Sequence, residues 1–489
     1  MTYLLTALVV LFAVEAAIRL PLFSQVQIIT QIPLRVIETI ASTTLSDNQK
    51  QREILKSSGA IFVAAFKLVA LIAIIVAIGL LPAFALAWAI PTERPVLEML
   101  STWEALFASI VIAMAYVAIR KRLIKSNGET PSQDESEYGP TARMLHSVAL
   151  GFPPITEASF DINRMIYKRD ASTQGPPVFI AGLARAGTTI LMRSIYSTGV
   201  YRSLTYRDMP FVLMPNIWSK FSSYFRTHRD AEERAHGDRI KVNYDSPEAF
   251  EEVFWRTFCQ REYIKKDSLR PHEANQEVIE KFRKYVSNVV ASAEDKQQLR
   301  YLSKNNNNLL RLGTIRKAFP DAVILIPYRD PIQHALSLQT QHERFTKQHD
   351  SDPFSLNYMN WLGHHEFGQN HKPFIFPNDK ANGERYSPEQ TEYWLDIWAR
   401  TYRHALQNVP QNSFFIGYER LCNEPGDVMN LLFERLGSEP PAEIHQTLQQ
   451  APTRDVADLD QNLVSEVHEV YQTLERNSLG YASCSESDR

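Results

Sequence analysis

The fold is decided by the stretch PVFIAGLARAGTTILMRSIYS, which occupies residues 177–197. It has the pattern of an apolar strand, then a loop that holds Gly182 and Gly187, then a helix. Glycines let backbone N–H groups approach a ligand closely, and the helix dipole favours negative charge at the first turn. The stretch therefore predicts a cradle for an anion at the carboxyl end of a strand.

This loop is a variant of the phosphate-binding loop. The spacing of Gly182 and Gly187 matches the pattern GxxxxGK[ST], but Thr188 stands where that pattern has lysine. Because the lysine serves the β- and γ-phosphates of nucleoside triphosphates, its absence counts against a kinase or a nucleotide hydrolase. The cation lies instead inside the loop, at Arg185, and Thr188 and Thr189 supply two hydroxyl groups at the helix start.

A second stretch, AVILIPYRDPIQHALS at residues 322–337, also leads from a strand into a helix. Arg329 ends the strand, where a guanidinium can bind a phosphate through two hydrogen bonds. Asp330 and Pro331 start the helix, and Ser337 follows about two turns later. In combination with the first loop, this stretch predicts a second contact to the same anionic ligand.

Together the two stretches resemble sulfotransferases that use 3′-phosphoadenosine 5′-phosphosulfate (PAPS). The first loop is most like the arginine form found in tyrosylprotein sulfotransferases and related bacterial enzymes. The resemblance covers roughly residues 175–481 and includes FFIGYERL at 414–421 and LGY at 479–481. It implies a P-loop-like fold and PAPS as the sulfuryl donor. The donor-binding residues that it implies are Arg185, Ala186, Gly187, Thr188 and Thr189 for the 5′-phosphosulfate, and Arg329 and Ser337 for the 3′-phosphate.

The resemblance also implies residues for the transfer step. Lys304 corresponds to a lysine that touches the sulfuryl oxygens, although tyrosylprotein enzymes follow it with Asp-Pro and this chain has two asparagines. The expected general base is Asp208, at the distance from the loop where those enzymes carry a glutamate, and the rival is His236. Glu366 and His342 are the next candidates.

We expect no metal site. The run His364-His365-Glu366 lacks the spacing of HExxH, so its residues are expected to line a pocket or the surface. Three widely spaced cysteines exclude a disulfide framework and a cysteine-based zinc site. The net charge of 52 − 55 = −3 argues against nucleic acid as a partner.

Three strand-like runs, at residues 177–181, 322–327 and 413–417, are each followed by a helical segment. This alternation predicts an α/β fold, a parallel sheet with helices on both faces. The length of 489 residues allows about three units. The polar run at 126–141 has the composition of a linker, so the sequence predicts a membrane unit at 1–125 and a catalytic domain at 142–489.

Residues 1–125 contain 11 Lys/Arg and 7 Asp/Glu, a net charge of +4, and long apolar runs. From Leu68 to Ile90 no charged residue occurs for 23 positions, which is enough for a transmembrane helix. Further spans are expected at about Thr102–Ile119 and, interrupted by Glu15, at Thr2–Leu20. With three spans, the basic flanks before residue 60 and at residues 120–125 would both be cytoplasmic, and the catalytic domain with them.

The sequence thus predicts an integral membrane sulfotransferase that moves a sulfuryl group from PAPS to a hydroxyl or amine. The acceptor is expected to be membrane-proximal, a small molecule, lipid or glycan. Two alternatives stay open at this point: a P-loop kinase or nucleotide hydrolase, and a membrane scaffold whose degenerate domain only binds nucleotide.

Overall fold

The computed structural model describes residues 2–22, 47–90, 95–102, 140–168, 175–222, 245–293, 299–377, 385–441 and 459–480, with a few short pieces between them. The chain divides into two compact units, Met1–Glu135 and Ser136–Arg489, which are considered separately below. Their border lies inside the segment that the sequence indicates as a linker.

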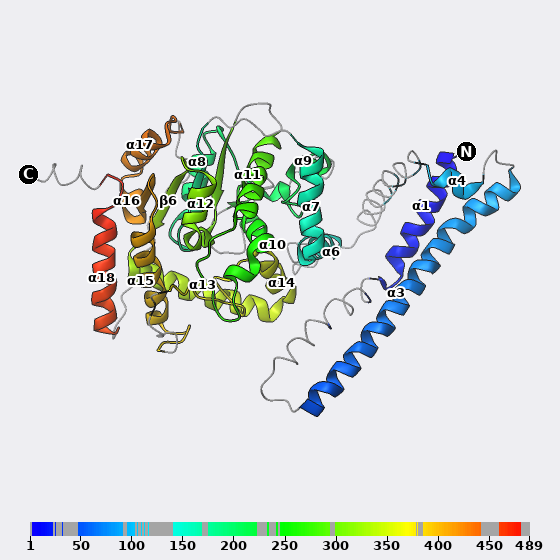
Figure 1. Ribbon diagram of the computed structural model, residues 1–489, viewed down its shortest axis with the longest axis horizontal. Helices are drawn as coiled ribbons and strands as arrows, with labels where there is room; N and C mark the ends of the chain where they lie inside the picture. The colour runs from blue at the N-terminus through cyan, green and yellow to red at the C-terminus, as the bar shows by residue number, and fades with distance from the viewer. Residues whose placement is uncertain are drawn as a thin grey trace, which may run out of the picture. The chain divides into compact units, whose positions relative to one another are not determined.

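The second unit is built on a parallel five-stranded sheet with the strand order β2-β5-β1-β6-β7. Figure 1 shows its strand β6 among the surrounding helices. Its strands are β1 (Val178–Ile180), β2 (Tyr201–Arg202), β5 (Arg300–Lys304), β6 (Val323–Tyr328) and β7 (Ser413–Gly417). The α/β prediction is confirmed, and the three runs that the sequence indicated are β1, β6 and β7. A separate antiparallel pair consists of β3 (Glu232–Glu233) and β4 (Lys241–Val242).

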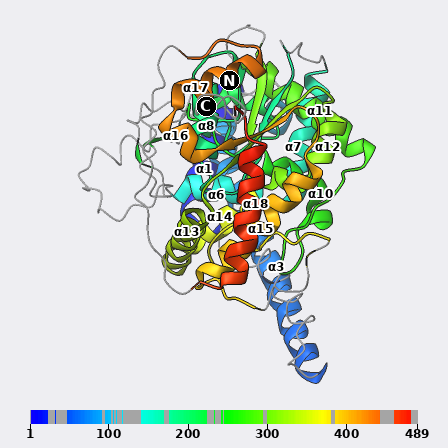
Figure 2. The ribbon, with the colours of Figure 1, turned by 90° about the vertical axis from the view of Figure 1, so that its left-hand side faces the viewer.

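Helices cover both faces of the sheet because successive strand residues point to opposite sides. Val178 and Ile180 of β1 pack in one apolar cluster with residues of α8, α16 and α17. Phe179, between them, packs in a larger cluster with residues of α10 to α13, α15 and α18. Figure 2 shows α18 alongside α15, which it contacts on this second face.

The helices of this unit are α6 (Pro140–Gly151), α7 (Pro153–Ile166), α8 (Thr188–Tyr196), α9 (Pro215–Ser222), α10 (Glu252–Tyr263), α11 (Gln276–Ala291), α12 (Leu312–Ala318), α13 (Pro331–Ser351), α14 (Pro353–Leu362), α15 (Thr391–Asn408), α16 (Tyr418–Asn423), α17 (Pro425–Leu436) and α18 (Gln461–Arg476). Two 3₁₀ turns, η1 (Tyr206–Asp208) and η3 (Asn306–Leu310), lie next to strands of the sheet.

The first unit contains α1 (Thr2–Arg19), α3 (Asp47–Ala89) and α4 (Val96–Leu100). Within α3, the segment Gln51–Ala89 is long and apolar enough to cross a membrane, and only 6% of its most apolar window is buried. It contains the predicted span Leu68–Ile90 except for the last residue. Helix α1 packs against α3, and its Glu15 accepts hydrogen bonds from Tyr116 (2.7 Å) and Arg19 (2.6 Å). Most of the predicted span Thr102–Ile119 lies outside the described residues.

Candidate active site

The glycine loop lies where the sequence predicts it, between β1 and α8 in the centre of the sheet. Gly182 passes so close to the backbone of Pro327 that a Cβ would lie 2.9 Å from its carbonyl oxygen. Gly187 has φ +85°, and a Cβ there would lie 2.8 Å from the ring of Tyr418. Both positions therefore require glycine. Arg185 also has a positive φ, 73°, a conformation that is uncommon for a residue with a side chain.

The two motifs meet at Arg185. Its Nε donates a hydrogen bond of 3.2 Å to Oγ of Ser337, across a sequence separation of 152 residues. A second contact fixes the loop, because Nε2 of His334 donates to the carbonyl oxygen of Ala184 at 2.8 Å. Burial lowers the pKa of His334 to about 3, so its imidazole is neutral at pH 7. Helix α13 therefore supports the loop from the side on which Ser337 lies.

Arg329 lies at the end of β6, with only 9% of its side chain exposed. Its guanidinium stacks 4.9 Å from the ring centre of Tyr418, and its Nε is 3.9 Å from a carboxylate oxygen of Glu419. That Nε is buried and has no hydrogen-bond partner among the described residues. A buried, incompletely paired guanidinium at a strand end fits an anionic ligand.

Lys304 ends β5, the neighbour of β1. The amide of the next residue, Asn305, donates to the carbonyl oxygen of Ile180, so Lys304 lies beside the strand that leads into the glycine loop. Nζ of Lys304 is 2.9 Å from Oε1 of Glu248, and both side chains are nearly buried, with 8% and 11% exposed. Glu248 is held in place by its own amide, which donates to the carbonyl oxygen of Leu204. The sequence analysis did not single out Glu248 as a candidate base.

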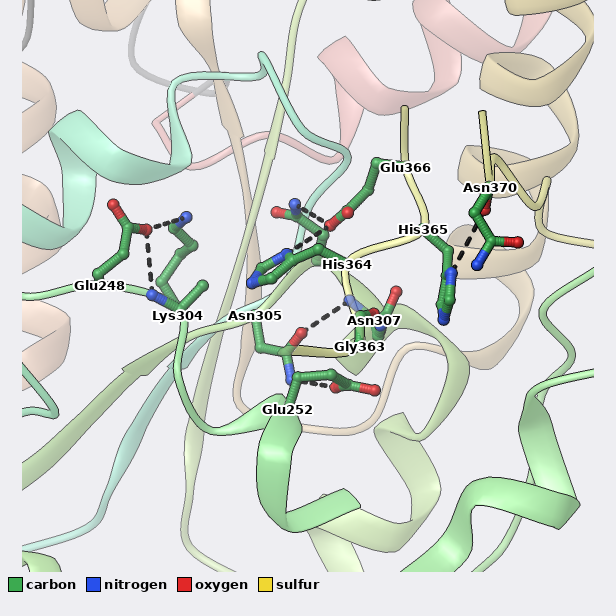
Figure 3. A network of polar contacts seen from close by, with 12 residues as sticks. Glu248, Glu252, Lys304, Asn305, Asn307, Gly363, His364, His365, Glu366 and Asn370 are labelled. Carbon is green, nitrogen blue, oxygen red and sulfur yellow. Dashed lines mark hydrogen bonds and ion pairs between the residues drawn. The ribbon is translucent and has the colours of Figure 1, made fainter. Parts of the chain in front are cut away.

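The asparagines after Lys304 build the adjoining wall, which Figure 3 shows. Asn305 donates to Glu252 of α10 at 2.6 Å, and Asn306 donates to Glu366 at 2.9 Å. Asn307 donates to the carbonyl oxygen of Gly363 at 3.3 Å. The departure from Asp-Pro thus has a structural consequence, because these amides tie the end of β5 to α10 and to residues 363–366.

His364 and Glu366 form a charged pair on this wall, with Nδ1 of the histidine 3.4 Å from Oε1 of the glutamate. Burial disfavours charge on both groups, but each stabilises the other. The net effect raises the pKa of His364 and lowers the pKa of Glu366 to about 2. The charges of Lys304 and Glu248 also act on the pKa of His364, the lysine lowering it and the glutamate raising it.

The candidate bases lie in different surroundings. Asp208 is buried and accepts a hydrogen bond from Arg202 at 2.7 Å. It also accepts one from the amide of Thr205 at 2.8 Å, and this second hydrogen bond caps η1. These are the contacts of a structural residue, and its role as the base stays a prediction. His236 lies outside the described residues. His342 packs against aromatic rings of His371 and Trp394, and burial lowers its pKa.

Thr188 and Thr189 start α8 and are buried. Within the described part of the chain, no group of three or more His, Cys, Asp or Glu side chains is placed to hold a metal ion. The local chemistry is that of a cationic cradle, with Arg185, Lys304 and Arg329 around the carboxyl ends of three adjacent strands.

Comparison with known proteins now assigns a family to this geometry. A family model described as "Sulfotransferase family" matches residues 176–441, more than half of the chain. The chain belongs to the sulfotransferase family. Family membership and the parallel sheet with its flanking helices support sulfuryl transfer rather than the kinase or nucleotide hydrolase alternative. Among individually curated proteins, none matches the chain in sequence.

This sulfotransferase is similar to three solved bacterial structures. With sulfotransferase STF1 from Mycobacterium tuberculosis H37Rv it shares 12% identity, at a TM-score of 0.39, over 65% of this chain and 82% of that one. With STF9 from Mycobacterium avium it shares 14% identity, at a TM-score of 0.35, over 70% of this chain and 86% of that one. With a sulfotransferase from Alicyclobacillus acidocaldarius it shares 14% identity, at a TM-score of 0.28, over 62% of this chain and 93% of that one.

Proposed function

We propose that this sulfotransferase takes its sulfuryl group from PAPS. The observation that carries the proposal is the junction of Arg185 and Ser337, which joins the two anion-binding motifs next to the incompletely paired Arg329. A donor with phosphate at both its 3′ and its 5′ position matches two cations, Arg185 and Arg329, that lie beside the contact between the glycine loop and α13. Arg329 and Ser337 would hold the 3′-phosphate, and residues 185–189 would hold the 5′-phosphosulfate.

When bound, PAPS supplies an activated sulfuryl group, and the chain positions it and stabilises the charge. Arg185 and Lys304 would face the sulfuryl oxygens, where fixed cations stabilise the charge that develops during transfer. His334 holds the loop through Ala184, and Gly182 and Gly187 bring its backbone close to the ligand.

We propose that Glu248 is the general base that takes the proton from the acceptor. Its carboxylate is nearly buried, lies 2.9 Å from Lys304, and borders the strand end beside the glycine loop. A base at this point stands next to the cation that would face the sulfuryl group, which is where the attacking oxygen must also be. Asp208 accepts hydrogen bonds at both carboxylate oxygens, from Arg202 at Oδ1 and from Thr205 at Oδ2, where it caps η1.

We further propose that α3 anchors the enzyme in a membrane and that the acceptor is a hydroxyl or amine of a membrane-proximal lipid, glycan or small molecule. The support is the helical segment Gln51–Ala89 and its largely exposed apolar side chains. A membrane anchor raises the local concentration of acceptors that lie in or near the same bilayer.

The donor is tested by calorimetry on the detergent-solubilised full chain with 3′-phosphoadenosine 5′-phosphate and with ATP. We expect tight binding of the first and weak binding of ATP. Arg329→Ala and Ser337→Ala should each weaken the binding of 3′-phosphoadenosine 5′-phosphate by about 1.5–3 kcal/mol, the cost of losing a hydrogen bond to a charged group. Arg344→Ala, an exposed arginine on the same helix as Ser337, is the matched control and should bind normally.

Equal affinity for ATP would contradict the PAPS assignment. Turnover is checked separately, by incubating the enzyme with ³⁵S-labelled PAPS and membrane lipid and glycan extracts. Tight nucleotide binding without label transfer to any extract would favour the nucleotide-binding scaffold over the enzyme.

A further inference from the structure

Exposed apolar side chains are concentrated in one place on the second unit. Among its described residues, seven large apolar residues are more than a third exposed, and six of them lie in α6, in α7 or between the two helices. These six, which we call the α7 face, are Leu145 (40% exposed), Phe152 (37%), Ile155 (36%), Ile162 (48%), Met165 (69%) and Ile166 (62%). The seventh is Val200, at 36%.

Helix α7 is more apolar on its exposed side than on its buried side. At 100° per residue, Ile155, Ala158, Ile162, Met165 and Ile166 fall within a stripe about 100° wide, and all five are exposed. The residues that α7 buries are Thr156, Ser159, Phe160 and Asn163, of which only one is apolar. A surface helix of a water-soluble unit normally has the opposite arrangement, so this stripe is arranged for a second apolar contact.

Basic side chains follow the α7 face at its carboxyl end. Arg164 is 49% exposed, beside Asp161 at 3.1 Å, and Lys168 is also exposed. Lys284 donates to the carbonyl oxygen of Lys168 at 3.1 Å, and Lys220 lies 5.2 Å from the ring centre of Tyr167. Apolar side chains with a cationic border are the composition of helices that lie in the interface of an anionic bilayer.

We infer that the α7 face binds the surface of a lipid bilayer. The inference rests on the proposed membrane anchoring, because the same chain carries the candidate span Gln51–Ala89. Only 50 residues separate Ala89 from Pro140, where α6 begins, so the anchored chain meets a bilayer at high effective concentration. A bilayer is therefore a more accessible partner for this surface than a second protein in solution.

The α7 face is linked to the candidate active site through α14. Helix α6 packs against α14, and a Cβ on Gly151 would lie 3.1 Å from the indole nitrogen of Trp361. Trp361 is three residues before His364. Because the ten residues of α14 extend over only about 15 Å, the wall that carries His364 lies close to the proposed bilayer contact. This placement suits an acceptor whose reactive group lies at the bilayer surface.

The test measures whether the α7 face enters lipid. The full chain, with Cys422→Ser and Cys484→Ser, is reconstituted into vesicles of phosphatidylcholine and phosphatidylglycerol and carries an environment-sensitive fluorophore on Met165→Cys. Lipids brominated along their acyl chains quench a fluorophore that lies among them. The positive control is Phe66→Cys on α3, and the negative control is Asp427→Cys on α17, which lies across the second unit from α7 (Figure 1).

We expect the label at 165 to be blue-shifted and quenched like the label at 66, and the label at 427 to be neither. Adding Ile162→Glu should abolish the quenching at 165 without changing the label at 66. If 66 is quenched and 165 behaves like 427, the inference fails and the anchor stands. If neither is quenched, the proposed anchoring fails as well. A blue shift at 165 without quenching would show that protein, not lipid, covers the α7 face.

Discussion

Two carboxylates, Glu248 and Asp208, contact different partners. Glu248 faces Lys304, whose charge would be shared with the sulfuryl group, whereas Asp208 holds Arg202 and η1. We predict that Glu248→Gln lowers kcat by about 10²–10⁴-fold, the usual contribution of a general base, with nucleotide affinity nearly unchanged. Steady-state kinetics and calorimetry on the same preparation measure both quantities.

Asp208→Asn is the companion variant, and it should act on stability instead. Removing one partner of a buried ion pair costs about 3–5 kcal/mol of unfolding free energy, and the folded fraction should keep its turnover. A loss of kcat in Asp208→Asn with an unchanged unfolding midpoint would return the role of base to Asp208.

The pair of His364 and Glu366 gives the site a charge that depends on pH. Its glutamate raises the pKa of His364 above the ordinary value of 6.5, in spite of burial. Since the folded-state pKa of His364 is the higher one, protonation of His364 contributes its full stabilisation below the unfolded-state pKa of the histidine and loses it as the pH rises through the folded-state pKa. The contribution of Glu366 has the opposite sign: it is present above the unfolded-state pKa of the glutamate and is lost as the pH falls through about 2. NMR titration of ¹³C-labelled histidine should therefore show His364 still protonated above pH 6.5.

Glu366→Gln removes the stabilising charge and should bring the pKa of His364 below 6.5, because burial then dominates. His342, whose pKa burial already lowers, is the internal reference and should not move. An unchanged titration of His364 in Glu366→Gln would mean that the two side chains do not interact.

At the scale of elements, the sequence predicted what is encoded locally. The glycine loop and the strand–RDP–helix motif are each contained in about twenty residues, so their places at the ends of two strands could be predicted from the local pattern, whereas the roles of their residues came from the resemblance. Glu248 could not be predicted, because 56 residues of sequence separate it from Lys304, and contacts of its loop with residues 204–206 help to hold it near the end of β5. The same holds for Asn306 and Glu366, which are 60 residues apart.

The junction of β5, α10 and α12 contains a buried ion pair that binds Asn305. Arg311 bonds both carboxylate oxygens of Glu252 (2.8 and 3.0 Å), and neither side chain is exposed. The guanidinium also lies between the rings of Trp255 and Tyr263, 4.8 Å from each. Glu252 also accepts a hydrogen bond from the side-chain amide of Asn305, the residue directly after Lys304.

We predict that Arg311→Met lowers the unfolding free energy by about 3–5 kcal/mol, because it leaves Glu252 charged, buried and unpaired. The double variant Glu252→Gln/Arg311→Met should recover part of the loss, since it removes the uncompensated charge. Urea denaturation followed by circular dichroism measures both. Additive losses in the double variant would indicate that the two residues contribute independently.

At the scale of the whole molecule, the proposed membrane anchor and the predicted number of spans decide on which side the catalytic domain lies. The predicted cytoplasmic side rests on basic residues: Lys50, Arg52 and Lys56 precede the apolar part of α3, and residues 120–125 follow the predicted span Thr102–Ile119. If α3 leaves the cytoplasm and that second span returns to it, the catalytic domain is cytoplasmic. If α3 alone crosses, the domain lies on the opposite side.

We predict three spans, with the N-terminus outside the cytoplasm and the catalytic domain inside. Tags at the two ends, in sealed inverted vesicles whose cytoplasmic face is outward, distinguish the possibilities by protease digestion. Three spans give a digested C-terminal tag and a protected N-terminal tag, whereas two spans leave both tags open to digestion. A protected C-terminal tag with a digested N-terminal tag would mean that α3 crosses alone, and it would place the candidate active site away from a cytosolic supply of PAPS. A lumenal marker protein must remain protected throughout, because only then does digestion of a tag report its side of the membrane.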